Sequence, residues 1–158
     1  MTASARTGTA LALFAAFAAL LLAGCVGKPQ KRVNPPQLSI QSLELQSGRR
    51  IVLELRLQNH SDVPMHFGSI DADLLLASHP ADQVVIALDL DVSPHSAEIF
   101  TYHFQPNDLV AGLFRRALDS GIGYRLIGSI HSNDPEQDFE LRATSQLNPV
   151  PGKPGQFR

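Results

Sequence analysis

Residues 50–58, Arg50-Ile-Val-Leu-Glu-Leu-Arg-Leu-Gln58, decide the fold class of this chain. Apolar side chains occupy every second position from Ile51 to Leu57. Glu54, Arg56 and Gln58, which alternate with them, are charged or carry an amide. Successive side chains of a β-strand point to opposite faces, so this alternation predicts a strand with one buried face. The residues expected on that face are Ile51, Leu53, Leu55 and Leu57.

The same alternation recurs on both sides of this stretch and is interrupted by clusters of turn-forming residues. Ser47-Gly48 predicts a hairpin between the first two strands, and residues 59–65, 93–96 and 132–136 are expected to be loops. In the third strand the expected inner face comprises Gly68, Ile70, Ala72, Leu74 and Leu76. Seven strands with turns between them predict an all-β, antiparallel β-sandwich. Besides residues 50–58, the expected strands are residues 38–45, 66–77, 83–90, 97–104, 124–131 and 139–147.

One segment departs from the two-residue period. Residues 107–121 repeat apolar side chains at helical spacing, with Asn107 as the expected N-cap and Gly121 as the stop. We expect a single short helix near residues 107–119 that packs its apolar stripe on the open end of the sandwich. The alternative is a stripe that docks on a membrane or a partner. The stripe comprises Leu109, Val110, Leu113, Phe114, Ala117 and Leu118.

The N-terminus predicts export and lipidation. Residues 10–23 form an apolar run of about fourteen residues, whereas a membrane-spanning helix needs about twenty, so residues 1–24 are expected to be a signal peptide. Leu22-Ala23-Gly24-Cys25 resembles the lipobox of bacterial lipoproteins. That resemblance implies cleavage between Gly24 and Cys25, a diacylglyceryl group on the Cys25 thiol, and a membrane partner reached through this anchor. The alternative is an unlipidated cysteine after an ordinary signal peptide.

The segments that flank the expected domain at residues 38–147 lack strand or helix patterns. Residues 25–37 are expected to be the lipidated cysteine and a flexible linker, because residues 26–37 contain three prolines and three basic residues. Val26 occupies the position where aspartate favours retention in the inner membrane. The expected location is therefore the outer membrane, facing the periplasm. Residues 148–158 are rich in proline and glycine and are expected to be a disordered tail.

Composition and motifs exclude several function classes. The chain of 158 residues has a net charge of −2, and the loss of Arg6 with the signal peptide would change it to −3. Because basic and acidic residues are interspersed, no nucleic-acid partner is expected. The sequence contains no Gly-x-Ser-x-Gly, His-Glu-x-x-His or glycine-rich phosphate loop. We therefore expect no enzyme, catalytic residue, cofactor or small-molecule substrate.

Two sets of side chains raise the question of metal binding. The six histidines lack helical i, i+4 and His-x-His spacing and are expected to be solvated rather than ligands of zinc or copper. Asp71 and Asp73, like Asp89 and Asp91, share one strand face and could approach calcium. Neither pair has the loop that would complete a calcium shell, so we expect no metal site and charges that deter edge aggregation. The histidines are His60, His66, His79, His95, His103 and His131.

Five parts of the chain carry a family resemblance: Pro36, Leu38-Ser-Ile-Gln-Ser-Leu-Glu-Leu45, Val52-Leu-Glu-Leu-Arg-Leu-Gln-Asn59, Asp71-Ala-Asp-Leu-Leu-Leu76 and Tyr124-Arg-Leu-Ile-Gly128. Through them residues 36–147 resemble the late embryogenesis abundant (LEA) type 2 family, also called the water-stress and hypersensitive-response (WHy) domain. The resemblance implies a fibronectin III-like or immunoglobulin-like sandwich, a helix near residues 107–119, no established catalysis, and a role in tolerance of drying or freezing. The family often has Asn-Pro where this chain has Asn59-His60, with proline delayed to Pro64.

Two functions follow as hypotheses. The first is a membrane-anchored, non-catalytic LEA type 2 (WHy)-like lipoprotein that protects envelope clients during desiccation or other stress. The second is a protein–protein interaction module that docks one specific envelope partner through a strand edge or loop. General protection predicts a diffuse polar surface, whereas specific docking predicts an exposed apolar patch of several hundred Å².

Overall fold

The computed structural model describes residues 31–46, 50–118 and 120–158. Residues 31–158 form one compact unit. The expected signal peptide, the cleavage site at Gly24 and Cys25, and the first part of the expected linker lie outside the described residues.

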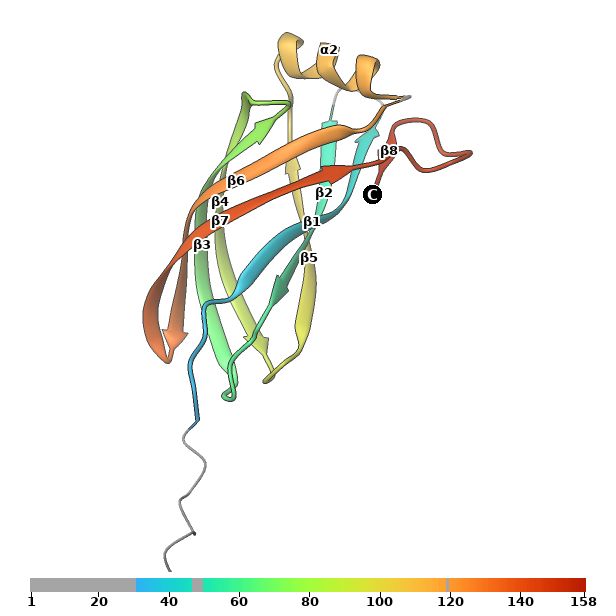
Figure 1. Ribbon diagram of the computed structural model, residues 1–158. Coiled ribbons are helices and arrows are strands. Elements are labelled where there is room, and N and C mark those ends of the chain that lie inside the picture. Colours follow the sequence, from blue (N-terminus) through green and yellow to red (C-terminus); the bar gives the residue numbers. More distant parts are fainter. Residues whose placement is uncertain (1–30, 47–49, 119) are drawn as a thin grey trace, which may run out of the picture. The chain divides into compact units, whose positions relative to one another are not determined.

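The described chain is an antiparallel β-sandwich, as the alternation predicts. One sheet has the strand order β5-β2-β1-β8 and the other has the order β4-β3-β6-β7 (Figure 1). The elements are β1 (Gln37–Gln46), β2 (Arg50–Gln58), β3 (Met65–Leu76), β4 (His79–Val92), β5 (Ala97–Phe104), α2 (Asp108–Ala117), β6 (Ile122–Asp134), β7 (Glu136–Leu147) and β8 (Gln156–Phe157).

The core lies between the two sheets. β1 and β2 pair from Gln46 opposite Arg50 to Gln37 opposite Gln58, which confirms the first hairpin. All four predicted inner residues of β2 are fully buried. They pack with the inner residues of the facing sheet, among them Ile70, Leu74 and Leu126. The alternation in the sequence therefore corresponds to the division between core and surface.

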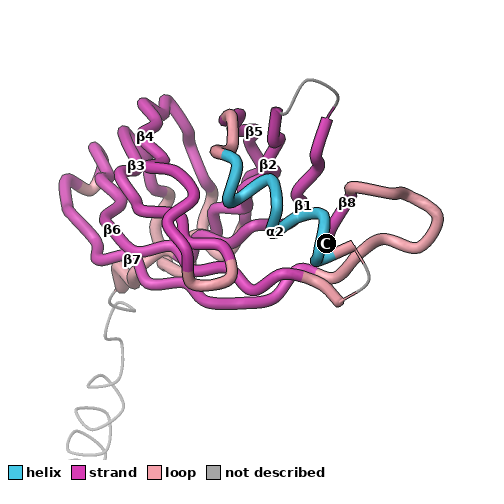
Figure 2. Tube along the Cα trace, turned by 90° about the horizontal axis from the view of Figure 1, so that it is seen from above, coloured by secondary structure: helices cyan, strands magenta, loops and turns pink. Residues whose placement is uncertain are grey.

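The helix α2 crosses one end of the two layers (Figure 2). Asn107 caps it as predicted, because its side chain accepts a hydrogen bond from the Val110 N–H at 2.9 Å. Phe114 is fully buried, but Leu109 and Leu118 are 50% and 41% exposed, so the expected stripe was too wide. Successive helical residues are about 100° apart, which turns Leu109 away from the face that Val110 and Phe114 bury.

Because of a β-bulge, the residues of the third strand that face the core differ in part from those that the sequence predicts. The pairing of β3 with its neighbours shifts between Phe67 and Ser69, and Gly68 lies at that shift. Because a bulge adds one residue, the inward positions before it are Met65 and Phe67 rather than Gly68. A Cβ on Gly68 would lie 2.5 Å from the side-chain oxygen of Asn133, so glycine leaves the space that this side chain occupies.

The fourth strand begins earlier than predicted. Ala77 and Ser78 have φ angles of 48° and 66° and form a two-residue turn, after which β4 starts at His79. Two-residue turns with positive φ at both positions match the twist of paired strands. The sequence offers neither glycine nor asparagine at this turn, which is why residues 79–82 were not recognised as strand.

The disordered tail predicted for residues 148–158 is wrong. Asn148 and Arg158 exchange two backbone hydrogen bonds of 2.7 and 2.8 Å, and β8 pairs with β1 through Phe157 opposite Leu43. The Phe157 side chain is fully buried, and its ring centroid lies 5.8 Å from that of Phe114 in α2. One aromatic side chain thus holds the segment against the core.

The described part of the expected linker is also attached to the domain. The Arg32 N–H donates to Asp62 Oδ2 at 3.0 Å, and the Asp62 N–H donates back to the Arg32 carbonyl at 2.9 Å. The Asn34 N–H donates to Ser61 Oγ at 2.9 Å. The expectation of a flexible linker as far as residue 37 is therefore corrected, because residues 32–34 bind the β2–β3 loop.

Candidate functional site

The main candidate is a cleft at the side of the sandwich where β1 faces β7. It has a volume of about 530 Å³. At its base the buried side chain of Tyr124, from β6, accepts a hydrogen bond from the Ile40 N–H at 3.1 Å. Its lining residues are Pro35, Pro36, Gln37, Leu38, Ser39, Tyr124, Glu140, Leu141, Arg142, Ala143, Thr144 and Ser145.

The cleft lies between two strand edges. β8 pairs with β1 only at Leu43 and Glu44, so β1 has a strand partner on one side alone from Gln37 to Ile40 among the described residues. β7 is the last strand of its sheet. Unpaired strand edges present backbone donors and acceptors to an added chain. The arrangement therefore suits an extended polypeptide.

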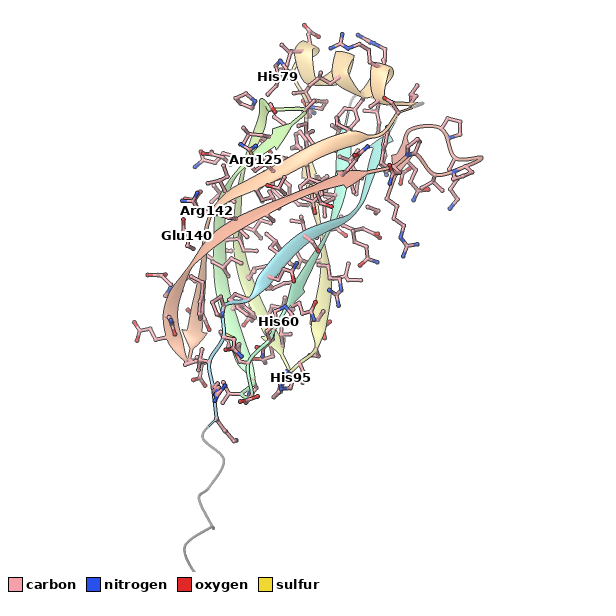
Figure 3. All side chains as sticks on the ribbon, viewed as in Figure 1. His60, His79, His95, Arg125, Glu140 and Arg142 are labelled. Atoms are coloured by element: carbon pink, nitrogen blue, oxygen red, sulfur yellow. The ribbon has the colours of Figure 1, made fainter. Side chains whose placement is uncertain are left out.

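The charged groups of this cleft neutralise each other. Arg142 forms an ion pair with Glu140 on the same strand, and both side chains lie on the flank of the β6–β7 hairpin (Figure 3). The other side chains of the lining include the hydroxyls of Ser39, Thr144 and Ser145. The chemistry available at the cleft is hydrogen bonding and apolar contact.

The opposite side of the sandwich holds a second polar contact between the sheets. The Tyr102 hydroxyl, from β5, donates to Asp82 Oδ2 in β4 at 2.8 Å. Burial, together with the hydrogen bond to Asp82 and its negative charge, raises the pKa of Tyr102 to about 12. The phenol stays protonated at neutral pH, so its role here is to hold the sheets together. A hollow of about 520 Å³ beside it includes Asp73, Asp82 and Asn107 in its lining.

His66 contacts two carboxylates, one through each ring nitrogen. Its Nδ1 lies 2.8 Å from Asp91 Oδ1, and its Nε2 lies 3.3 Å from Asp89 Oδ1. The hydrogen bond to Asp91 raises the pKa of His66, with further contributions from the charges of Asp91, Asp89 and Asp134, against a smaller opposing effect of burial. Sequence reasoning missed this group because it depends on which strands pair.

Four other histidines each contact a different neighbour. His131 lies 2.7 Å from Asp138 and His95 lies 3.1 Å from Asp62, whereas His60 and His79 contact an amide and a backbone carbonyl. In Figure 3 His79 lies at the end of the sandwich near α2, and His60 and His95 lie toward the other end. No group of three or more His, Cys, Asp or Glu that could hold a metal ion occurs within the part of the chain that is described.

The two carboxylate pairs have separate surroundings. Asp71 and Asp73 lie exposed on the outer face of β3, and Asp71 accepts a hydrogen bond from Gln83 at 3.2 Å. Asp89 and Asp91 both face His66 instead of an open coordination position. The structure therefore does not bring the two pairs together.

Asn59 is a structural site that joins two loops. Its side-chain amide donates to the carbonyls of Val63 and Val92 at 2.8 and 3.0 Å, and its oxygen accepts from the Ser61 N–H at 2.8 Å. The residue is fully buried. No role was predicted for Asn59 from the sequence, although its place at the end of a strand and before a cluster of turn residues is the signal that could have indicated one.

The fold defines a small, two-sheet antiparallel β-sandwich domain. A scan against protein-family models gives no match, and no curated protein matches the chain. The solution structure of AT1g01470 from Arabidopsis thaliana is similar in fold, with a TM-score of 0.56 and 14% identity, over 78% of this chain and 87% of that one. A crystal structure from Archaeoglobus fulgidus gives a TM-score of 0.41 at 10% identity, over 75% and 98%.

The likeness to the Arabidopsis protein concerns the fold alone. Among the residues that the structure describes, no helix has the length and apolar character needed to cross a bilayer.

Proposed function

We propose that this chain is a membrane-anchored, non-catalytic lipoprotein of the LEA type 2 (WHy) kind, which protects envelope proteins or lipids during drying, freezing or other stress. The stretches that resemble the family all fall within a single sandwich domain, from Pro36 to the end of β7. The proposed location is the outer membrane, facing the periplasm.

The observation that carries this proposal is the dispersed polar surface of both sheets. The large apolar side chains exposed on the sheets are Val85, Ile99 and Ile127, and each belongs to a different strand. Charged residues such as Asp71 and Asp73 stand between them on the outer faces. Sheet faces on which charged residues separate the exposed apolar side chains stay hydrated and make weak contacts with many clients rather than a tight contact with one.

The anchor is tested at Cys25. In the Cys25→Ser variant the thiol that would carry the diacylglyceryl group is absent, so we expect no acylation and a loss of mature protein from the membrane fraction. Mass spectrometry of the N-terminal peptide and membrane fractionation measure both effects. An unchanged membrane-bound, mature product in the variant contradicts the lipobox assignment. Val26→Asp tests the sorting, and we expect it to shift the protein toward the inner membrane.

Protection is tested with a client enzyme that loses activity on freezing or drying. We expect the purified lipoprotein to preserve more activity than an unrelated β-sandwich protein at the same concentration. Equal protection by the unrelated protein contradicts a specific protective role, because any added protein then suffices.

The β1/β7 cleft favours a second candidate, an interaction module for one envelope protein. Strand addition at this cleft predicts a stoichiometric partner in a pull-down from solubilised membranes. Ser39→Arg combined with Ser145→Arg places bulk at the cleft and should abolish the capture. Thr101 is exposed on β5, away from the cleft, so Thr101→Arg is the matched control and should leave the capture of the partner unchanged. Recovery of no stoichiometric partner by the unaltered protein contradicts this candidate.

A further inference from the structure

We propose that the end of the sandwich formed by α2 and the C-terminal loop binds an anionic lipid surface. We call this region, comprising α2, Leu118 and residues 149–158, the helix end. Figure 1 places α2 and the loop before β8 at the end opposite the one where the described chain begins. The contact between Phe114 and Phe157 joins the two segments.

Apolar side chains are exposed at the helix end. Leu109, in the first turn of α2, and Leu118, at its C-cap, are 50% and 41% exposed and lie on opposite sides of the buried stripe. Leu118 also lines a groove of about 560 Å³. The other apolar residues of this groove are Pro149, Val150, Pro151 and Pro154.

Positive charge surrounds these apolar residues. Arg115 and Arg116 on α2 and Lys153 and Arg158 in the C-terminal segment are all exposed. None of the four forms an ion pair with another described residue. Asp108, in the first turn of α2, is the one acidic side chain among the described residues of the helix end, so four cations outnumber a single carboxylate there.

The opposite end of the sandwich is acidic. Its loops and strand ends carry six carboxylates around the β2–β3 and β6–β7 connections, although the whole chain has a net charge of only −2. The positive field of the helix end is thus separated along the strands from the negative field at the other end. The six are Asp62, Asp89, Asp91, Asp134, Glu136 and Asp138.

Exposed leucines beside free cations favour lipid over other anionic ligands. Because the apolar stripe of α2 is buried in the core, contact with acyl chains falls to Leu109, Leu118 and the apolar groove residues, while arginine and lysine contact anionic headgroups. A nucleic-acid site would instead be expected to expose aromatic side chains for stacking, and α2 exposes none in its described residues. Charge complementarity and the exposed leucines together indicate a membrane rather than a soluble anion.

The position of this surface has a consequence that rests on the proposed lipid anchor. Cys25 precedes Lys31 by a stretch that reaches about 20 Å at most, and Lys31 lies at the acidic end. The 12 residues of β3 extend over about 40 Å. The described chain thus begins at the end of the domain opposite the helix end, and we expect the anchored protein to capture a second, anionic membrane surface.

Vesicle capture tests the proposal with the full, lipidated protein. The protein is reconstituted into phosphatidylcholine donor vesicles and mixed with protein-free, labelled acceptor vesicles of phosphatidylcholine, with or without phosphatidylglycerol. We expect capture of the anionic acceptors only, and its loss at high salt. The Arg115→Glu/Arg116→Glu variant should lower capture by about tenfold or more. Leu109→Ser/Leu118→Ser should also lower it.

The matched control is Arg56→Glu/Arg125→Glu, which makes the same charge change on β2 and β6, away from the helix end, and should leave capture unchanged. Circular dichroism and melting temperature establish that each variant is folded. Capture that ignores phosphatidylglycerol, that is equal in the α2 charge variant and the control, or that does not occur overturns the proposal.

Retention in the donor vesicles is scored separately. Protein that fails to stay with the donors contradicts the lipid anchor but leaves the helix end testable, because the released chain should still float with anionic vesicles and not with neutral ones. Absence of that flotation would overturn the helix-end proposal as well.

Discussion

The backbone N–H of Ile40, in β1, donates to the side-chain hydroxyl of Tyr124, in β6, at 3.1 Å. The two residues belong to different sheets, so this hydrogen bond spans the sandwich at the side where β1 has no strand beside it. The bond gives the buried N–H of Ile40 a hydrogen-bond acceptor at a place where no neighbouring strand provides one.

Removing the Tyr124 hydroxyl leaves that donor without its partner. We expect Tyr124→Phe to lower the free energy of unfolding by about 1–2 kcal/mol, the cost of a buried donor left unsatisfied. Urea unfolding measures the change. Tyr102→Phe, whose hydroxyl meets Asp82 at a less buried place, is the control and should cost less. Equal losses in both variants would contradict the special role of the Ile40 donor.

Substitution of Asn59 should lower the free energy of unfolding more than substitution of most other polar residues. Asn59→Ala removes donors to the Val63 and Val92 carbonyls and the acceptor for Ser61, all at a fully buried site. We expect a loss of about 2–4 kcal/mol in chemical unfolding, because several buried groups lose partners at once. Gln58→Ala, a half-buried neighbour, should cost less than about 1 kcal/mol. A similar cost for both substitutions would show that the loop network adds little.

The C-terminal segment should contribute to the stability of the core. Phe157→Ala removes a fully buried ring that packs on Phe114, so we expect a loss of about 3–5 kcal/mol in urea unfolding. Val33→Ala, at a 40% exposed position outside the strands, should change stability by less than about 0.5 kcal/mol. Wild-type stability in the Phe157 variant would restore the view of residues 148–158 as a dispensable tail.

Two glycines should respond to alanine in opposite directions. A Cβ on Gly128 would lie 2.0 Å from the Asp71 carbonyl oxygen, so Gly128→Ala should separate β3 from β6 and severely lower the melting temperature. A Cβ on Gly112 would meet only the far ends of Arg115 and Arg116, at 3.9 and 4.0 Å. Gly112→Ala should therefore stabilise the protein by about 0.5–1 kcal/mol through helix propensity. Destabilisation at Gly112 would contradict the described surroundings of α2.

The contacts of His66 predict a pH-dependent contribution to stability. The pKa of His66 is raised in the folded protein, chiefly by its hydrogen bond to Asp91, so folding favours the protonated ring. This contribution is fully present below about pH 6.5, the ordinary histidine value, and disappears as the pH rises through the folded-state pKa. The stability difference between wild type and His66→Gln should therefore shrink with rising pH.

An NMR titration of the His66 ring tests the cause directly. In Asp91→Asn the main partner loses its charge, so the pKa of His66 should fall toward the ordinary histidine value. A pKa that does not change in this variant would contradict the assignment to Asp91.

The sequence by itself determined the elements that depend on neighbouring residues. The alternation of Ile51, Leu53, Leu55 and Leu57 predicted a strand, and Asn107 predicted where the helix begins. Period and capping follow from backbone geometry and from contacts a few residues apart, so they can be identified without knowledge of the fold. All seven predicted strands and the helix occur in the structure.

Only the tertiary structure decided what depends on distant pairing. The bulge that turns Gly68 out of the core, the burial of Phe157 and the bond between Ile40 and Tyr124 each need a partner more than 60 residues away or a neighbouring strand whose identity the sequence does not display. A two-residue strand such as β8 has no detectable period. The gathering of cations at one end is likewise a product of strand direction, which brings α2 and the C-terminal loop together and separates them from the acidic end.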